Sequence, residues 1–94
     1  MIGWMAAVAL AAPGAETGID FVGPPACVRL AVESLEAVRL TNGCAGPVLV
    51  DQRALRAAED SPVVPPGAEV LLAGLAAFTL GVDGELHIAV AVSR

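Results

Sequence analysis

Apolar and polar residues alternate along most of this chain in short runs that are separated by Gly, Pro, Asn-Gly and Asp-Gly. The alternation is clearest over residues 28–33, 37–41, 77–82 and 86–92. Because successive side chains of a β-strand point to opposite faces, a period of two predicts strands with one buried and one solvated face. Such runs, with turn signals about every 8 to 12 residues, are typical of a β-sandwich or barrel.

Three shorter apolar runs complete the set of predicted strands, at residues 47–50, 63–64 and 70–72. Residues 51–60 form the only stretch with helix character, because Asp51 can cap an N-terminus, and we expect one short helix near residues 52–59. Ala and Leu dominate residues 71–80, so a buried helix there is the alternative to strands. The whole pattern predicts an all-β fold, a small antiparallel β-sandwich with about six or seven short strands.

The last two predicted strands form the strongest hairpin signal, and the loop between them decides which side chains face the core. Two apolar rows flank the Asp83-Gly84-Glu85 turn: Phe78, Leu80 and Val82 before it, and Leu86, Ile88, Val90 and Val92 after it. A two-residue turn would set Leu80 opposite His87, whereas a three-residue loop sets Leu80 opposite Ile88. We predict the three-residue loop, because it turns both apolar rows inward and leaves His87 on the solvated face.

Two cysteines flank the first predicted hairpin. If this hairpin pairs through its apolar faces, Leu30 lies opposite Leu40, and Cys27 then lies opposite Gly43. A β-bulge at Gly43, where glycine adopts positive φ readily, would bring Cys44 beside Cys27. Such a bridge closes a loop of about 18 residues and would contribute on the order of 3 kcal/mol in an oxidising compartment. The alternative is two unpaired, buried thiols.

The N-terminus resembles a secretory signal peptide. An apolar run over residues 2–12 ends in small residues before the first acid, Glu16, although no Lys or Arg precedes it. We predict a signal peptide or a disordered leader over residues 1–15 and a single β-sandwich domain over residues 16–94, in a secreted or periplasmic protein. The run is too short for a stable membrane span, which needs about 20 apolar residues. The alternative is a first strand or short helix packed on the body, formed by Trp4, Met5, Val8 and Leu10.

The charge pattern narrows the range of partners. The 94 residues carry a formal net charge of −5, with five Arg and no Lys. Binding a phosphate backbone needs a basic stripe. Here the basic and acidic residues are interleaved: Arg29, Arg39, Arg53 and Arg56 alternate with Glu33, Glu36, Asp51 and Glu59. The sequence therefore argues against a nucleic-acid partner.

No residue pattern supports a catalytic or cofactor site. A blue-copper site needs two His and a Cys, and a structural zinc site needs four ligands. His87 is the only histidine, and both Met lie at the N-terminus. A hydrolytic triad would have to combine His87 with a Ser and an acid, and the chain contains no Gly-x-Ser-x-Gly motif. We expect a protein that is not an enzyme and has no cofactor.

Surface loops remain as candidate binding segments, since loops on a rigid sandwich carry most binding functions. The longest predicted loop spans residues 51–67, and its candidate partner-binding residues are Gln52, Arg53, Arg56, Pro65, Pro66 and Gly67. The alternative is a plain crossover between sheets. Self-association through an exposed strand edge is a second possibility, at Val63-Val64 or over residues 86–92.

The overall arrangement resembles bacterial periplasmic immunoglobulin-like sandwich modules, although no motif is specific to one family and no residue role is carried over. The sequence leads us to expect a non-catalytic extracytoplasmic module that binds or scaffolds a protein partner. One alternative is an inhibitor of a secreted hydrolase, with the Pro65-Pro66-Gly67 segment as its inhibitory loop. The other is a small enzyme or metal-binding protein.

Overall fold

The computed structural model describes residues 18–34, 36–57, 59–74 and 77–93, which form eight β-strands and one turn of 3₁₀ helix. In chain order the elements are β1 (Ile19–Val22), β2 (Val28–Ser34), β3 (Ala37–Asn42), β4 (Val48–Val50), η1 (Gln52–Ala54), β5 (Val63–Val64), β6 (Glu69–Ala73), β7 (Ala77–Val82) and β8 (Glu85–Ser93). The alternation pattern did not single out β1. The expected helix near residues 52–59 is reduced to η1, where the Asp51 carboxylate caps the turn by accepting the N–H of Arg53.

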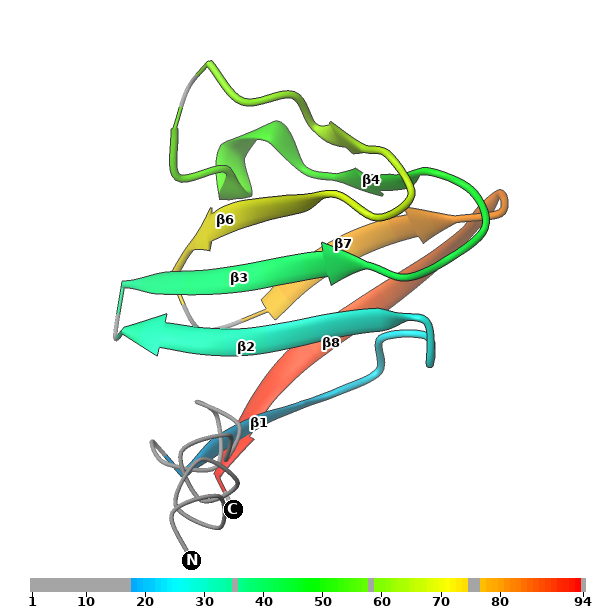
Figure 1. The fold of residues 1–94 in the computed structure, drawn as a ribbon. Helices are drawn as coiled ribbons and strands as arrows, with labels where there is room; N and C mark the ends of the chain where they lie inside the picture. Colours follow the sequence, from blue (N-terminus) through cyan, green and yellow to red (C-terminus); the bar gives the residue numbers. More distant parts are fainter. Residues whose placement is uncertain (1–17, 35, 58, 75–76, 94) are drawn as a thin grey trace, which may run out of the picture.

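The strands form two antiparallel sheets packed face to face (Figure 1). One sheet has five strands in the order β1-β8-β7-β4-β5, and the other has three in the order β2-β3-β6. The chain crosses between the sheets after β1, β3, β5 and β6. This arrangement confirms the predicted all-β sandwich. The alternative of a buried helix over residues 71–80 is wrong, because β6 and β7 occupy the described parts of that range.

The topology does not establish the immunoglobulin-like part of the prediction. The immunoglobulin fold has four strands, A, B, E and D, in one sheet, whereas this sandwich has sheets of three and five strands. Here the consecutive strands β2 and β3 form a hairpin within the three-stranded sheet, in which Leu30 pairs with Leu40 and Val32 with Val38. The structure therefore supports a β-sandwich without assigning it to the immunoglobulin type.

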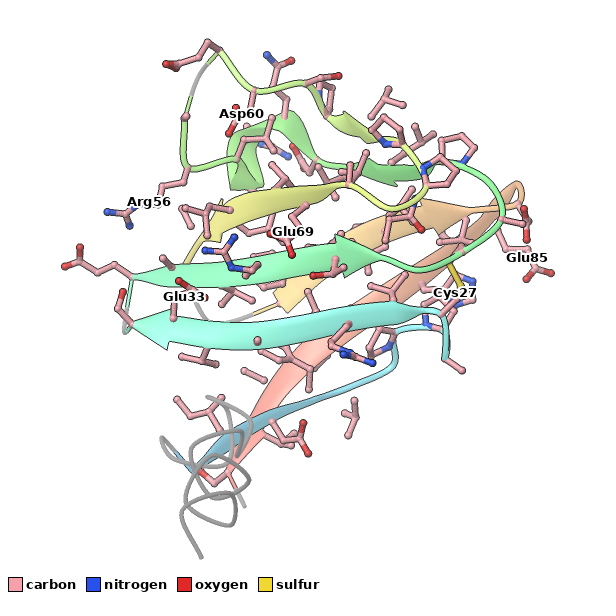
Figure 2. The ribbon with its side chains drawn as sticks, viewed as in Figure 1. Cys27, Glu33, Arg56, Asp60, Glu69 and Glu85 are labelled. Atoms are coloured by element: carbon pink, nitrogen blue, oxygen red, sulfur yellow. A yellow bond between two sulfur atoms is a disulfide. The ribbon has the colours of Figure 1, made fainter. Side chains whose placement is uncertain are left out.

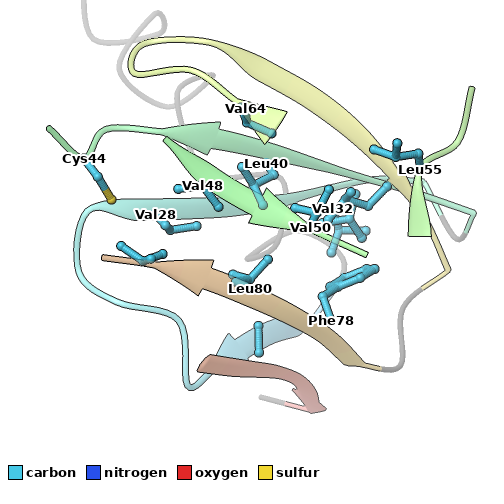
Figure 3. Packing of buried hydrophobic residues seen from close by; sticks show 14 residues of the cluster. Val28, Val32, Leu40, Cys44, Val48, Val50, Leu55, Val64, Phe78 and Leu80 are labelled. Atoms are coloured by element: carbon cyan, nitrogen blue, oxygen red, sulfur yellow. The ribbon is translucent and has the colours of Figure 1, made fainter. Parts of the chain in front are cut away.

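Aliphatic side chains from both sheets fill the space between them (Figure 3). Leu40 and Leu72 from the three-stranded sheet meet Val48 and Leu80 from the five-stranded sheet, and all four are fully buried. The rest of this buried cluster consists of Val28, Val32, Val38, Cys44, Val50, Leu55, Val64, Phe78, Val82 and Ala89. Burying one such aliphatic side chain stabilises a fold by about 1.5–3 kcal/mol, so this layer holds the two sheets together.

The β7–β8 hairpin has a different register from the one we expected. Leu80 pairs with His87 and Val82 with Glu85, so the loop is the two-residue turn Asp83-Gly84. Both turn residues have positive φ, 53° and 79°, as a type I′ turn requires. The expectation of a three-residue loop is wrong, because the Asp-Gly turn fixes the pairing independently of the hydrophobic pattern.

This register reverses the expected faces of β8. The inward row consists of Glu85, His87, Ala89, Ala91 and Ser93, and the outward row of Leu86, Ile88, Val90 and Val92. Phe21 of β1 pairs with Ala91 and Phe78 of β7 pairs with Ala89, and the two ring centroids are 5.9 Å apart. The aromatic rings fill the space that the small alanines leave on the inner side. His87 therefore lies partly buried on the inner side, not on the outer face as expected.

The first hairpin has the expected register, but the expected bulge is absent from its position. The Gly43 N–H donates to the Cys27 carbonyl at 2.8 Å, so these two residues lie opposite each other. Gly43 does not have positive φ, and the ladder is irregular at its other end, between Val32 and Ser34. A Cβ at Gly43 would lie 2.9 Å from the Cys27 carbonyl oxygen. Glycine is therefore needed here for close approach of the chains and not for its φ.

The predicted leader over residues 1–15 lies outside the described residues, as does the alternative element built from Trp4, Met5, Val8 and Leu10. The predicted domain over residues 16–94 is described from Gly18 onward. The leader therefore stays a prediction.

Candidate functional site

Cys27 and Cys44 form the disulfide that the hairpin register predicts (Figure 2). Their Cα atoms are 4.8 Å apart, within the ordinary range for a disulfide, and 17 positions separate them in the sequence. Cys27 precedes β2 and Cys44 follows β3, so the bridge closes the open end of this hairpin. Cys44 belongs to the buried core. Because such a bridge forms and persists under oxidising conditions, the folded chain belongs in an extracytoplasmic environment.

The side chain of Asn42 organises the same end of the sandwich. It is fully buried, and its amide nitrogen donates to the carbonyl oxygens of Gly46 at 2.9 Å and Val64 at 2.8 Å. Its side-chain oxygen accepts the N–H of Cys44 at 2.7 Å. These bonds tie β3 to the Cys44 loop and to β5 in the opposite sheet. Both amide donors are used internally, so Asn42 is a structural residue that the sequence analysis treated only as part of a turn.

The six residues of the predicted partner loop do not form one surface: Gln52, Arg53, Arg56, Pro65, Pro66 and Gly67. Arg56 donates from Nη1 to the carbonyl oxygen of Glu36, just before β3 begins. Gly67 donates its N–H to the carbonyl oxygen of Asn42, where β3 ends. The two halves of the loop therefore lie at opposite ends of β3, and the structure does not bring them together (Figure 2).

The two predicted association edges have different places in the five-stranded sheet. Val63-Val64 is β5, the strand at one end of the sheet order, as expected for an edge. Residues 86–92 lie in β8, which pairs with β1 on one side and with β7 on the other. β1, which the sequence pattern missed, pairs with residues 90–93 and so covers the edge of β8 over that part of the strand only.

The outer face of the three-stranded sheet carries a charged network, and we call it the polar face. Its outward residues are Arg29, Ala31, Glu33, Arg39, Thr41, Glu69 and Leu71. Arg39 donates from Nε to Glu33 at 2.9 Å and from Nη1 to Glu69 at 2.8 Å, and Figure 2 shows both carboxylates on this face. The hydrogen bonds from Arg39 lower the pKa of Glu33, and those to the carboxylates raise the pKa of Arg39. This face is therefore adapted to water.

The outer face of the five-stranded sheet is apolar, and we call it the apolar face. Its seven large side chains have exposed fractions of 37–78%: Val22, Leu49, Val63, Leu86, Ile88, Val90 and Val92. Strand pairing makes them neighbours, since Val22 lies opposite Val90 and Leu49 lies opposite Val63. Among the described outward positions of this sheet, Asp20 at the β1 margin is the one charged residue. The chain thus exposes aliphatic side chains of β1, β4, β5 and β8 on one sheet, with Ala77, Thr79 and Gly81 of β7 between them.

A shallow hollow lies in the apolar face at Gly81. This residue pairs with Leu49 on one side and with Leu86 on the other, and it has no side chain to fill the space between them. Pro47 and the β7–β8 turn complete the walls of the hollow. Leu86, which is 78% exposed, therefore protrudes directly beside a depression.

The described residues offer little for metal or acid-base chemistry. No three His, Cys, Asp or Glu side chains among them lie close enough together to hold a metal ion. The Nε2 atom of His87 is 3.9 Å from the Glu85 carboxylate, beyond hydrogen-bond distance. In the same described part of the chain, no helix is long and apolar enough to cross a membrane.

The apolar face is the surface that the sequence analysis missed, because it assigned the outward row of β8 to the core. The Asp83-Gly84 dipeptide was the available signal, since it favours a two-residue turn. The chain matches no protein-family model, no curated protein and no solved structure at a significant level. Its function must therefore be inferred from its own surfaces.

Proposed function

We propose that this chain is a non-catalytic extracytoplasmic module, secreted or periplasmic, that binds a protein partner through the apolar face. The observation that carries the proposal is the exposure of seven large aliphatic side chains on one sheet. The largest apolar patch on a typical monomer is about 300–600 Å², and patches at or above this size commonly mark interaction sites. Burying apolar surface gains about 25 cal/mol per Å², which gives such a face a driving force for association.

The chemistry of the face favours binding as its role. Aliphatic side chains such as Leu86 and Ile88 can exclude water and pack against another surface, but they cannot move protons or ligate metals. Their backbone is paired with β7, so the surface is pre-formed and little ordering is needed on binding. The loop over residues 51–67 lacks this continuity, since its candidate residues lie at both ends of β3.

A photo-crosslinking residue in place of Leu86, in the cells that produce the chain, tests this proposal. Leu86 is highly exposed, so the replacement is compatible with folding. We expect a covalent adduct with a protein. The matched control places the same residue at Ala31 on the polar face, where we expect none. Absence of an adduct at position 86, or equal adducts at both positions, would contradict the proposal.

Intact mass of the protein recovered from those cells tests the compartment. We expect a mass two daltons below that of the dithiol form, restored by reductant, and a mature N-terminus after the predicted leader. Free thiols on the full-length chain would exclude export.

A further inference from the structure

We infer that the partner of the apolar face is a second copy of this chain, bound face to face about a two-fold axis. This inference rests on the proposed function, because it names the protein that the face binds. In the dimer the two five-stranded sheets pack against each other, and both polar faces point to solvent. Aligned sheets that pack in this way lie about 10 Å apart.

The distribution of charge favours a second copy. The chain carries a net charge of −5, so two copies repel each other unless their interface keeps charged groups apart. Asp20 is the one charged residue at the described outward strand positions of the apolar face, and Asp83 and Glu85 lie at the rim of its hollow, while the Arg39 network lies on the opposite sheet. Face-to-face packing therefore separates the charged faces as far as the sandwich allows. A partner recognised through charge complementarity would find few groups to bind on this face.

The area of the face is sufficient for a dimer. With exposed fractions of 37–78%, the seven large side chains present on the order of 600 Å² of apolar surface, the upper end of what monomers leave exposed. Complete burial of two such faces would remove at most about 1,200 Å² from solvent, which reaches the lower limit for specific, stable protein interfaces. Contacts of the smaller β7 side chains and of the backbone add to this area.

The relief of the face is self-complementary. Leu86 protrudes beside the hollow at Gly81. A two-fold axis presents the same protrusion and the same hollow from each copy, so each Leu86 can fill the hollow of the other copy. This arrangement places the axis between Leu86 and Gly81, and Ile88 is the next outward residue of β8 beside it.

Pairing through strand edges would not bury the apolar face. β1 and β5 are the outer strands of the five-stranded sheet, and adding a strand to either would leave the apolar face in water. Only packing against the face itself removes the side chains of β8 from solvent.

Sedimentation velocity of the oxidised full chain over a concentration series tests the inference. We expect a dimer for the wild type and a monomer for Ile88→Asp, with the dissociation constant raised at least about 100-fold, because like charges meet near the axis. Ile88→Thr keeps a β-branched residue and should weaken the dimer less, while leaving the thermal midpoint of the monomer, measured below the concentration of dimer formation, unchanged. Ala31→Asp introduces the same charge on the polar face and should leave the dimer intact.

A monomeric wild type at every concentration, or a dimer unaffected by Ile88→Asp, would overturn the inference. Trp4 is the only tryptophan, so its emission separates the alternatives in a monomeric chain. A shift to longer wavelength in Ile88→Asp would identify the N-terminal segment as the group that covers the face. A monomer that still forms an adduct with a different protein at position 86 would uphold the proposed function while rejecting the second copy.

Discussion

The two outer faces of this sandwich cover the same core but have opposite chemistry. On the three-stranded sheet, alternation directs Arg39 and its carboxylate partners outward and the valines and leucines inward. On the five-stranded sheet, the outward row of β8 is the more apolar one, and Ala89 and His87 face inward. The comparison teaches that alternation identifies which residues share a face but does not by itself identify the buried face.

The β2–β3 hairpin and β8 differ in the row of side chains that lies opposite the large aliphatic row. In β2 and β3 one row is charged and the other aliphatic, so only one orientation avoids burying charge. In β8 one row is aliphatic, and the other has Ala89 and Ala91 at its middle, while Glu85 and Ser93 stay exposed at its ends and His87 is only partly buried. Neighbouring side chains and the turn then determine which row of β8 faces the core. Phe21 and Phe78 occupy the space that a row of large aliphatic side chains would need.

Removing the disulfide should have the largest effect on stability. The bridge closes the β2–β3 hairpin of the three-stranded sheet, and the five-stranded sheet has no such cross-link among its described residues. We expect the double change Cys27→Ser and Cys44→Ser to lower the free energy of unfolding by about 3 kcal/mol, since the open chain gains loop entropy. Denaturant titration at equilibrium measures the loss, with chemically reduced wild type as the matched control. An unchanged midpoint would mean that packing of the hairpin makes the bridge redundant.

Asn42→Ala should have the next largest effect, because this side chain bonds from β3 to β5 and so joins the two sheets. The change leaves the carbonyl groups of Gly46 and Val64 and the N–H of Cys44 without their partner, and we expect a loss of about 2 kcal/mol. Thermal unfolding of the oxidised protein measures it. Thr41→Ala, an outward neighbour in the same strand, serves as the control, and equal losses for both variants would refute a special role for Asn42.

Leu86→Thr should change the stability of the monomer by less than about 0.5 kcal/mol, because the side chain is exposed on the apolar face. Binding of an apolar fluorescent dye should fall, and both quantities are measured at concentrations below dimer formation. This variant also checks the register of the last hairpin. A loss of about 2 kcal/mol or more is expected only if Leu86 faces the core, as a three-residue loop would require.

Arg39→Met should have the smallest effect on stability at neutral pH, because the ion pairs of the polar face are exposed and screened. Its effect should depend on pH. The hydrogen bond from Arg39 holds the pKa of Glu33 below its ordinary value, so this contribution is present above about pH 4.3, the ordinary glutamate pKa, and is lost on further acidification. Wild type and variant should therefore converge in midpoint as the pH falls. A difference that grows on acidification would contradict this assignment.

The sequence by itself determined the strands from β2 to β8, the sandwich class and the pairing of the first hairpin. Charged residues fix the outward side of β2 and β3, and that register brings Cys27 and Cys44 together without help from the rest of the fold. Short-range rules suffice there because Leu30 and Leu40 have no acceptable alternative to burial.

Tertiary structure alone decided the orientation of β8, the position of β1 and the role of Asn42. β1 pairs with residues 90–93 of β8, and its Phe21 packs with Phe78 over the small inward row of β8. Asn42 acquires its role only when β5 of the opposite sheet comes within hydrogen-bond distance. The apolar face results from this packing, because the large aliphatic row of β8 is the one that hydrophobicity alone would bury, whereas the Asp83-Gly84 turn and the two Phe side chains place the small row inside.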